Sequence, residues 1–147
     1  MSIIKISVIT ITYNAENVIM RTLDSVLKQT FSNIEHIIID GASKDSTLFA
    51  EKEYESRSCS ANNGHEIKII SEPDKGLYDA MNKGIGKATG NYLVFLNAGD
   101  VFPSSSTLET VADMIGDGEE LPGALFCDTN ILVDNVNSLR HRRVSPP

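Results

Sequence analysis

Residues 6–11 read ISVITI and set the architecture of the chain. A second run of the same kind, IEHIII, occupies residues 34–39. Strands covered by helices on both faces carry nearly continuous β-branched and apolar runs, whereas half-exposed strands alternate apolar with polar residues. The two runs therefore predict parallel strands in the interior of a layered α/β fold.

The segment between these runs predicts a helix that joins them. Val18, Leu23 and Val26 recur at helical spacing within residues 16–29, which is typical of a helix that buries one face. A strand, a helix and a second parallel strand complete a βαβ unit. The same alternation continues along the chain. It predicts an α/β fold with a Rossmann-like, mostly parallel sheet flanked by helices on both faces.

The remaining elements follow from local signals. Asp45-Ser46-Thr47 offers cap oxygens for a second helix, which extends to residue 57. Ser106 followed by Glu109 fits a capping box that starts another helix. The other predicted elements are a polar loop over residues 58–64, a helix over residues 77–88, strands over residues 67–71 and 92–96, and a strand or hairpin arm over residues 124–133.

Size and charge restrict the function. The chain has 147 residues, of which 41% are hydrophobic, so residues 1–147 can form one self-supporting domain. The net charge of −7 argues against nucleic-acid binding, because affinity for the phosphate backbone needs clustered Lys and Arg. Backbone amides, a few placed side chains and a divalent cation can still hold a small anionic ligand.

Cysteine usage and the first residues bear on localisation. Cys59 and Cys127 form no CxxC pair, which favours reduced thiols. The start of the chain runs directly into a strand pattern and lacks the features of a signal peptide. We therefore expect a cytoplasmic protein, with peripheral contact at the inner face of a membrane as an open alternative.

Polar clusters follow four of the predicted strands. They read TYN at residues 12–14, DGAS at 40–43, EPDK at 72–75 and NAGD at 97–100. In an open parallel sheet, the ligand crevice lies outside the carboxyl ends of the strands. The four clusters therefore predict one shared site for a small molecule.

Four blocks of the sequence resemble, in the same order, the start of a family 2 glycosyltransferase of GT-A fold. The blocks are residues 7–14 (SVITITYN), 40–45 (DGASKD), 72–90 (EPDKGLYDAMNKGIGKATG) and 91–100 (NYLVFLNAGD). Asp128-Thr129 and the basic stretch near Arg140 resemble the looser region that follows in that family.

The resemblance implies an enzyme that transfers a sugar from a nucleotide-diphosphate donor, with a UDP-sugar as the first expectation. The acceptor would be a saccharide or lipid-linked hydroxyl in polysaccharide or glycoconjugate assembly, and the anomeric centre would be inverted. The implied donor-binding residues are Thr12, Tyr13, Asn14, Glu16, Asp40, Ser43, Lys75, Gly76, Asp79, Asn82 and Asn97.

The implied contacts with the nucleotide have structural alternatives. Asp40 would accept the N–H of a uracil-type ring, or it could be a turn carboxylate that satisfies local amides. Tyr13 and Asn14 would border the nucleotide, although Asn14 could simply cap the following helix. Glu16 could likewise favour the positive end of that helix.

The segment that resembles the family's lining for the sugar and the diphosphate contains Asp74-Lys75-Gly76 and Asp79 with Asn82. Lys75 would supply positive charge to the diphosphate, and Asp79 would accept hydrogen bonds from sugar hydroxyls. The alternative for Asp79 is a charge pair with Lys83 at the i,i+4 spacing of a helix.

The NAGD block implies a divalent metal, Mg²⁺ or Mn²⁺. Negative charge develops on the leaving nucleoside diphosphate, and a metal ion or fixed donors must stabilise it. The block departs from the family's DxD pattern, because Asn97 replaces the first acid and Asp100 is left as the metal-binding carboxylate. One protein carboxylate can suffice for Mg²⁺, which keeps several waters and binds substrate phosphates. The alternative is a Gly-Asp turn without a ligand.

No general base is assigned. The family carries its base well beyond the metal motif, and only 47 residues follow Asp100. Asp128 and Asp134 are acids of the right type, but the resemblance maps the base onto neither. We therefore expect a donor-binding portion that lacks the segment for the acceptor and the base, so that the isolated chain could be inactive.

Other functional classes stay open. The chain could be a catalytically inactive nucleotide-sugar-binding module or a partner subunit. A receiver domain or a dinucleotide-binding oxidoreductase fits poorly, because no GxGxxG, P-loop or adjacent acid pair follows the first strand. Arg140, Arg142 and Arg143 could approach an anionic acceptor or a membrane surface, although basic runs near a terminus are usually solvated. The sequence does not indicate an oligomeric state.

Overall fold

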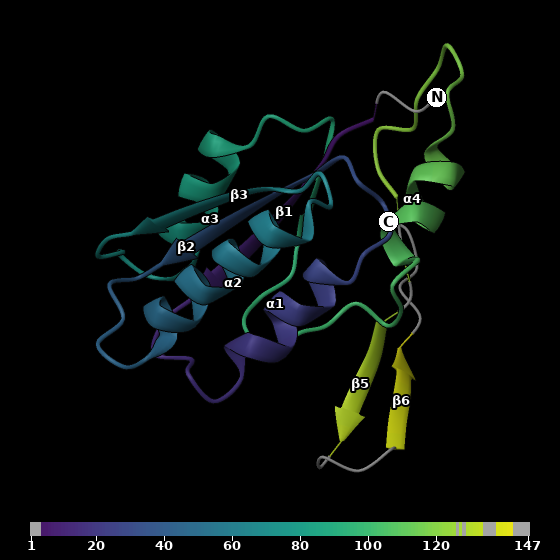
Figure 1. The fold of residues 1–147 in the computed structure, drawn as a ribbon. Coiled ribbons are helices and arrows are strands. Elements are labelled where there is room, and N and C mark those ends of the chain that lie inside the picture. The colour runs from purple at the N-terminus through teal and green to yellow at the C-terminus, as the bar shows by residue number, and fades with distance from the viewer. Residues whose placement is uncertain (1–3, 126, 128, 134–137, 143–147) are drawn as a thin grey trace. The chain divides into compact units, whose positions relative to one another are not determined.

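The computed structural model describes residues 4–125, 127, 129–133 and 138–142. It divides into two compact units, Met1–Gly116 and Asp117–Pro147. The first unit contains a parallel sheet with its helices, and the second contains a β-hairpin (Figure 1).

The first unit is built on a four-stranded parallel sheet in the order β3-β2-β1-β4. The strands are β1 (Ile6–Thr12), β2 (Ile34–Asp40), β3 (Glu66–Ser71) and β4 (Tyr92–Phe95). The helices are α1 (Ile19–Leu27), α2 (Thr47–Ala61), α3 (Leu77–Lys87) and α4 (Thr107–Ile115). Within the described part of the chain, no helix is long and apolar enough to cross a bilayer.

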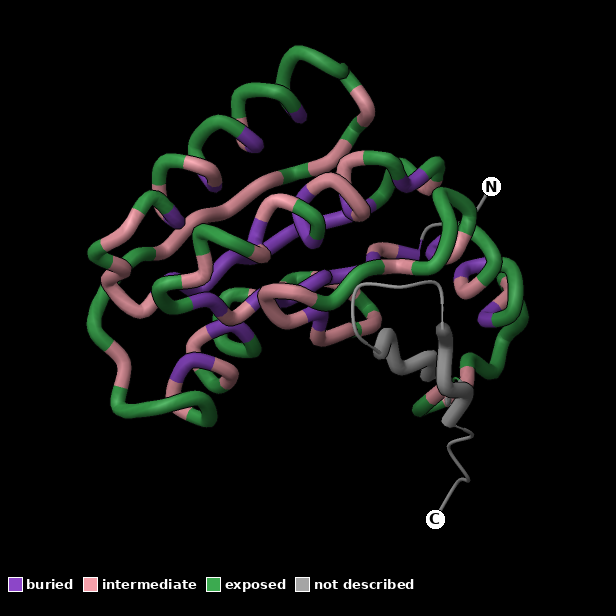
Figure 2. The backbone as a smooth tube through the Cα atoms, turned by 90° about the horizontal axis from the view of Figure 1, so that it is seen from below, coloured by how far each residue is buried: buried purple, intermediate pink, exposed green. Residues whose placement is uncertain are grey.

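Helices cover both faces of the sheet. Ile37 and Ile39 of β2 pack with Ala80 of α3 on one face. Ile38 packs with α1 and with Tyr54 of α2 on the other face, because successive residues of a strand point to opposite sides. Strand β2 is therefore buried along its whole length (Figure 2). The predicted α/β fold, with a parallel sheet between helices, is confirmed.

Helix α3 contains Gly84 because the helix lies very close to the sheet. A Cβ atom at Gly84 would be only 2.5 Å from Cγ2 of Ile9 in β1. The glycine costs the helix about 1 kcal/mol relative to alanine, but it permits this close approach. The helix predicted over residues 77–88 is confirmed as Leu77–Lys87.

Helices α1 and α2 differ from their predicted bounds, and α1 ends at Leu27 rather than at residue 29. Helix α1 begins at Ile19 rather than at residue 16, because residues 16–18 form a turn in which the Val18 N–H donates to the Ala15 carbonyl. Helix α2 continues to Ala61, so the loop predicted from residue 58 begins only at Asn62. Asn62 ends the helix with φ at 49°, a left-handed conformation that asparagine tolerates better than most residues.

The predicted capping box at α4 is wrong. Ser106 is the N-cap residue, but its side chain makes no capping hydrogen bond. The Glu109 carboxylate instead accepts a hydrogen bond of 2.7 Å from the hydroxyl of Thr30. Glu109 therefore attaches α4 to the segment after α1 rather than closing the start of its own helix.

A buried carboxylate ties together the edge of the sheet at which the strands begin. Glu35 of β2 is fully buried and accepts hydrogen bonds from Ser7 Oγ (2.5 Å), Lys68 Nζ (2.6 Å) and both the N–H (2.8 Å) and hydroxyl (2.7 Å) of Thr89. Burial alone would raise the pKa of Glu35, but these hydrogen bonds outweigh it and hold the pKa well below its usual range. An ionised Glu35 thus joins three strands to the segment before β4.

The second unit contains an antiparallel hairpin. Strand β5 (Thr129–Val133) pairs with β6 (Ser138–Arg142). The strand or hairpin arm predicted over residues 124–133 is confirmed for Thr129–Val133. Asp128, Asp134 and Arg143 lie outside the described residues.

Candidate functional site

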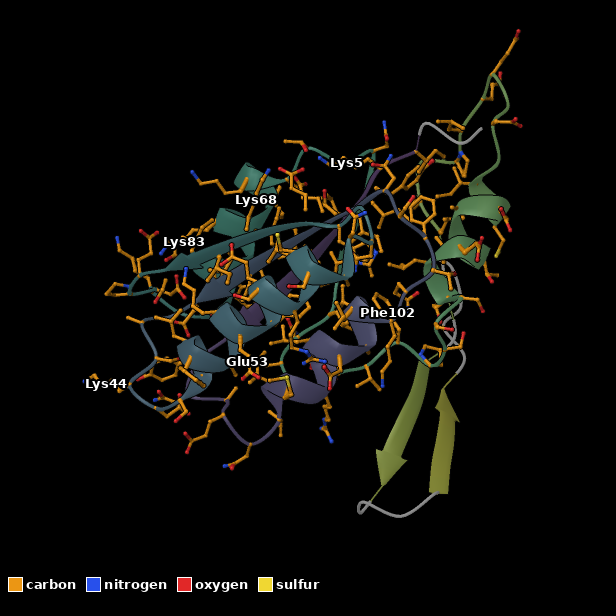
Figure 3. The ribbon with its side chains drawn as sticks, in the orientation of Figure 1. Lys5, Lys44, Glu53, Lys68, Lys83 and Phe102 are labelled. Carbon is orange, nitrogen blue, oxygen red and sulfur yellow. The ribbon has the colours of Figure 1, made fainter. Side chains whose placement is uncertain are left out.

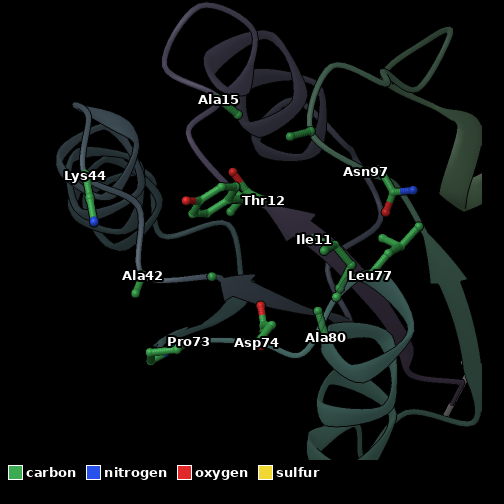
Figure 4. A pocket seen from close by; sticks show the side chains of 14 residues that line it. Ile11, Thr12, Ala15, Ala42, Lys44, Pro73, Asp74, Leu77, Ala80 and Asn97 are labelled. Atoms are coloured by element: carbon green, nitrogen blue, oxygen red, sulfur yellow. The ribbon is translucent and has the colours of Figure 1, made fainter.

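A pocket of about 780 Å³ lies at the carboxyl ends of all four strands of the parallel sheet (Figure 4). Each of the four polar clusters contributes to it, and so does the start of α3. Its volume is within the range of small-molecule sites. The lining residues are Ile11, Thr12, Tyr13, Ala15, Gly41, Ala42, Lys44, Pro73, Asp74, Gly76, Leu77, Ala80, Asn97 and Ala98.

Four of the sequence-predicted site residues line this pocket: Thr12, Tyr13, Gly76 and Asn97. The other predicted residues do not line this pocket. They are Asn14, Glu16, Asp40, Ser43, Lys75, Asp79, Asn82 and Asp100.

Several of those other residues hold together the loops that follow β1 and β2. The Asn14 side chain accepts from the Lys44 N–H (2.9 Å), and Ser43 Oγ accepts from the Asn14 N–H (2.9 Å). The Glu16 carboxylate accepts from the Ser46 N–H (2.9 Å). Two further bonds run from the Ala15 and Glu16 amides to Thr47 Oγ1 (2.8 Å) and Asp45 Oδ2 (3.2 Å). Asn14 therefore bridges two loops rather than capping α1.

The carboxylate of Asp40 is occupied by hydrogen bonds within the protein. Asp40 is fully buried. Its Oδ2 accepts hydrogen bonds from the Ser43 N–H (3.0 Å) and the Ser71 hydroxyl (2.6 Å). The Ser43 hydroxyl donates to Oδ1 as well. These contacts match the alternative in which Asp40 is a turn carboxylate that satisfies local groups.

Asp74 is the carboxylate that lines the pocket. Its side chain is 11% exposed, and its Oδ1 accepts a hydrogen bond of 2.6 Å from Lys83 Nζ. Lys83 also donates to the Pro73 carbonyl (3.0 Å) and pairs with Glu72 (3.1 Å), and the hydrogen bond to Asp74 is the main cause of its raised pKa. Lys44 and Lys83 both lie toward the edge where the strands end (Figure 3).

Tyr13 and Asp74 meet at Gly41. A Cβ atom at Gly41 would be 3.1 Å from Asp74 Oδ2 and 3.3 Å from Tyr13 Cδ2. The bare backbone of Gly41 therefore lets an aromatic ring and a carboxylate approach it together. Tyr13 is 62% exposed, so much of its ring surface is free to contact a ligand.

The start of α3 is organised by Asp79. Its Oδ2 accepts from the Lys75 N–H (2.9 Å) and lies 3.6 Å from Lys83 Nζ. The Lys75 hydrogen bond is the main cause of the lowered pKa of Asp79. The i,i+4 contact predicted as the alternative for Asp79 is therefore present. Lys75 and Asn82 are both exposed.

The turn after β4 carries the NAGD block. Gly99 has φ at 102°, and its N–H donates to Thr22 Oγ1 (2.8 Å), while the Asp100 N–H donates to the Asn97 carbonyl (2.9 Å). Asn97 Oδ1 is buried and has no hydrogen-bond partner among the described residues. Asp100 is exposed.

The oxygen donors of this turn fit a hard divalent cation in part. An orphaned amide oxygen on Asn97 and an exposed carboxylate on Asp100 are ligand types that Mg²⁺ and Mn²⁺ accept. Over the described residues, no group of three or more His, Cys, Asp or Glu could hold a metal. A cation here would therefore depend on waters and on ligand phosphates for most of its coordination.

A buried chain of hydrogen bonds fixes the residue before this turn. Thr10 Oγ1 donates to the Leu96 carbonyl (2.8 Å) and lies 2.8 Å from His36 Nε2, while Tyr54 Oη lies 2.7 Å from His36 Nδ1. Because the Thr10 proton goes to Leu96, His36 must donate from Nε2 and accept from Tyr54. Burial lowers the pKa of His36 to about 3. The ring is therefore neutral at physiological pH, and these hydrogen bonds are kept.

Sequence reasoning missed several contributors to the site. The resemblance places Asp74 in the segment for the sugar and the diphosphate but predicts no role for its side chain, and Lys83, nine residues later, is the sequence signal for the pair that fixes it. The sequence does not indicate that Ala42 and Lys44 line the pocket, because their positions depend on the left-handed conformation of Ala42 (φ 60°). The sequence also does not indicate the hydrogen bonds between His36 and Tyr54, since a single histidine in a strand is more often part of the core.

The comparisons with known proteins agree with this arrangement. The Glycosyl transferase family 2 model matches residues 7–140. A PGL/p-HBAD biosynthesis glycosyltransferase of Mycobacterium tuberculosis is 38% identical over 113 residues, which are 77% of this chain and 42% of that protein. Glycosyltransferase GlyA of Streptococcus pneumoniae is 34% identical over 96 residues, which are 65% of this chain and 13% of that protein.

Two solved structures have the same fold. The mannosyltransferase PcManGT from Pyrobaculum calidifontis, in complex with GDP-Man and Mn2+, has a TM-score of 0.65 and 26% identity, covering 78% of this chain and 33% of its own. TarS 1-349 of S. aureus, in complex with UDP-GlcNAc, has a TM-score of 0.64 and 26% identity, covering 91% of this chain and 41% of its own.

The parallel sheet between helices, the family match and the similar solved structures together define a glycosyltransferase fold of the GT-A type. The chain belongs to glycosyl transferase family 2. It spans less than half the length of these relatives.

Proposed function

We propose that the pocket binds a nucleotide-diphosphate sugar, with a UDP-sugar as the first candidate, and that the whole protein transfers the sugar to an acceptor hydroxyl with inversion. One observation carries the proposal: all four strand ends contribute to one pocket, and two of its lining residues, Thr12 and Asn97, hold buried oxygens that have no hydrogen-bond partner among the described residues. Buried polar atoms without partners are rare in folded proteins. A polar ligand would supply the missing partners.

The nucleoside would lie on the β1 and β2 side of the pocket. The exposed ring of Tyr13 offers an apolar face to a base, and the hydroxyl of Thr12 offers a hydrogen bond. Asn14, Glu16 and Ser43 would contribute by holding the two exit loops in position. Asp40 would contribute in the same way, through its contacts with Ser43 and Ser71.

The diphosphate would lie between the start of α3 and the turn after β4. Gly76 is the N-cap residue of α3 and provides no side-chain cap, so the first amides of the helix can donate to an anion. Lys75 is exposed next to it and would add positive charge. Asn97 and Asp100 would hold Mg²⁺ or Mn²⁺ at the same place. When bound, a divalent cation stabilises the negative charge that develops on the leaving nucleoside diphosphate.

The sugar would extend along α3. Asn82 is exposed and can hydrogen-bond to hydroxyl groups. Asp79 already fixes the Lys75 amide, and its remaining acceptor positions can bind a sugar hydroxyl.

We propose that residues 1–147 form the donor-binding portion of the enzyme, without the segment that binds the acceptor and carries the general base. The covered share of the relatives, 42% and 13%, supports this reading. The acceptor would be a saccharide or a lipid-linked sugar in polysaccharide or glycoconjugate assembly. A cytoplasmic location, at the inner face of a membrane for a lipid-linked acceptor, belongs to the same proposal.

A catalytically inactive nucleotide-sugar-binding subunit is the second candidate. The observation that favours it is the turn after β4, where Asp100 is the only carboxylate of the NAGD block. Donor hydrolysis or transfer by the full-length protein separates the candidates, because an inactive subunit would bind the donor and never turn it over.

The proposed function is tested by thermal unfolding of the chain with UDP, GDP and their sugars, each with and without Mn²⁺. A ligand at 100 times its Kd should stabilise the native state by about 2.7 kcal/mol. We expect stabilisation that is stronger with Mn²⁺, and we expect Asp100→Ala to lose this additional stabilisation by Mn²⁺. Asp113→Ala removes an exposed acid on α4 and should keep the response. Absence of stabilisation by every nucleotide would reject the function.

A further inference from the structure

Lys83 of α3 contacts every acid of the segment that leads from β3 into α3. Residues 72–83 contain three acids, Glu72, Asp74 and Asp79, and two lysines, Lys75 and Lys83. The Lys83 Nζ lies 2.6 Å from Asp74 Oδ1 and 3.1 Å from Glu72 Oε1. It lies 3.6 Å from Asp79 Oδ2. One ammonium group is therefore shared among all three carboxylates, and Lys75 is the other positive charge of the segment.

Two of these acids lie beside the place proposed for the diphosphate. Asp74 lines the pocket, and Asp79 accepts a hydrogen bond of 2.9 Å from the Lys75 N–H just before α3 begins. The uncapped amides at the start of α3 attract an anion, whereas carboxylates near them repel it. The affinity for an anion at this position therefore depends on how far the carboxylates are neutralised.

Lys83 is held in place, stays charged and does not line the pocket. Its side chain is 24% exposed, and it also donates to the Pro73 carbonyl (3.0 Å). The hydrogen bond to Asp74 is the main cause of its raised pKa, so the ammonium keeps its proton at neutral pH. Because Lys83 is not among the lining residues, it would act on a ligand through the acids rather than by direct contact.

We propose that Lys83 is a positioning residue of this site: its charge offsets the acids around the start of α3, so that an anionic ligand can bind there and Lys75 stays free to face it. The proposal rests on the proposed function, since it concerns the diphosphate of the same site. With Lys83, residues 72–83 carry two positive and three negative charges, a net charge of −1. Without Lys83 the net charge is −2, next to the position of the negative ligand.

A purely structural role of Lys83 predicts a different dependence. If Lys83 served only to attach α3 to the loop after β3, its bonds to Asp74 and Pro73 would matter and the charge of the segment would not. If Lys83 acts through its charge, removal of one negative charge elsewhere in the segment can replace it. The two roles therefore differ in whether a second substitution restores ligand affinity.

The test measures the Kd of UDP and of GDP for the chain by calorimetry, with Mn²⁺ present. Lys83→Met removes the charge and should weaken nucleotide binding about five- to tenfold, because uncompensated charges a few ångströms from the phosphates interact this strongly near a protein surface. Lys83→Arg keeps the charge and should bind nearly as tightly as the unchanged chain. Lys87→Met is the matched control. It removes an exposed lysine from the last turn of α3 and should keep the Kd.

The second substitution is Glu72→Gln. The Glu72 side chain is 53% exposed and does not line the pocket, so its loss removes a negative charge without removing a lining group. The double variant Lys83→Met/Glu72→Gln returns the segment to a net charge of −1 without restoring the bonds of Lys83, and it should recover most of the lost affinity. Glu72→Gln alone keeps the Lys83–Asp74 hydrogen bond and should bind the nucleotide more tightly than the unchanged chain.

The outcomes separate the two proposals. If neither UDP nor GDP binds the unchanged chain, the proposed function fails and the role of Lys83 fails with it. If a nucleotide binds and Lys83→Met leaves its Kd unchanged, the role of Lys83 is wrong and the proposed function stands. A loss that Glu72→Gln does not restore, or that Lys87→Met reproduces, overturns it as well. If Lys83→Met does not fold, Glu72→Gln alone gives the answer: tighter binding supports the role, and an unchanged Kd contradicts it.

Discussion

At the scale of single residues, two buried carboxyl groups of the first unit, Asp40 and Glu51, have opposite surroundings. Asp40 is held by Ser43 and Ser71, whereas both carboxyl oxygens of Glu51 are buried without a hydrogen-bond partner in the described residues. Burial, reinforced by the negative charge of Asp40, raises the pKa of Glu51 to about 8. Glu51 is therefore mainly neutral at pH 7, and ionising it costs free energy.

This difference predicts a pH-dependent cost at Glu51. The unfolded pKa is near 4.5, so the folded chain binds more protons than the unfolded chain between pH 4.5 and 8, and stability falls as pH rises through that window. Glu51→Gln removes the titration and should raise the free energy of unfolding at pH 8 by about 1–3 kcal/mol. Urea unfolding at pH 4.5 and pH 8 measures it. An equal effect at both pH values would contradict the prediction.

At the scale of elements, α3 combines two demands. Its first turn borders the pocket through Gly76, Leu77 and Ala80, while Gly84 packs against β1. The contact between Gly84 and β1 therefore helps to position the start of α3 at the pocket.

Gly84→Ala tests this coupling. The new Cβ would be 2.5 Å from Ile9 Cγ2, so the helix must move or the core must rearrange, at a cost of about 1–3 kcal/mol. Gly86→Ala is the control in the same helix. Its Cβ would meet nothing within 4 Å, and it should stabilise the helix by up to about 1 kcal/mol. Chemical unfolding of both variants should show opposite signs; two variants of equal stability would contradict this account.

The sequence predicts the elements better than it predicts which residues face the pocket. The apolar runs of β1 and β2 and the spacing in α1 and α3 depend on local periodicity, which is visible in a single chain. The four polar clusters also predict the correct edge of the sheet. The lining depends on the path of the loops, such as the left-handed Asn14 and Ala42, and on the pairing of Asp74 with Lys83, which bring together residues that periodicity does not relate.

At the scale of the whole molecule, a cluster of ion pairs and hydrogen bonds around Glu35 lies at the edge of the sheet opposite the pocket. Lys68 and Lys5 lie 2.6 and 3.6 Å from Glu35, and Ser7 and Thr89 add hydrogen bonds from β1 and from the segment before β4. One carboxylate thus connects most of the sheet.

Glu35→Gln should destabilise the fold by about 2–4 kcal/mol at pH 7, because it leaves buried donors without a charged acceptor. The folded pKa lies below the unfolded value near 4.5, so the contribution is present above pH 4.5 and is lost as pH falls below it. The difference between Glu35→Gln and the unchanged chain should therefore shrink at pH 3. Guanidinium unfolding at both pH values measures it, with Glu53→Gln, an exposed acid on α2, as control. If the difference in the free energy of unfolding between the two proteins were the same at pH 7 and pH 3, Glu35 would not stabilise the sheet as an ionised carboxylate.

The five hydrogen bonds between the loops after β1 and β2 have a consequence for the kinetics of recognition. Each loop is the other's scaffold, so a ligand meets a surface whose conformational entropy has already been lost during folding. Capture then needs little rearrangement. The two loops would therefore select a ligand by its complementarity to a preformed surface, without a slow conformational change after binding.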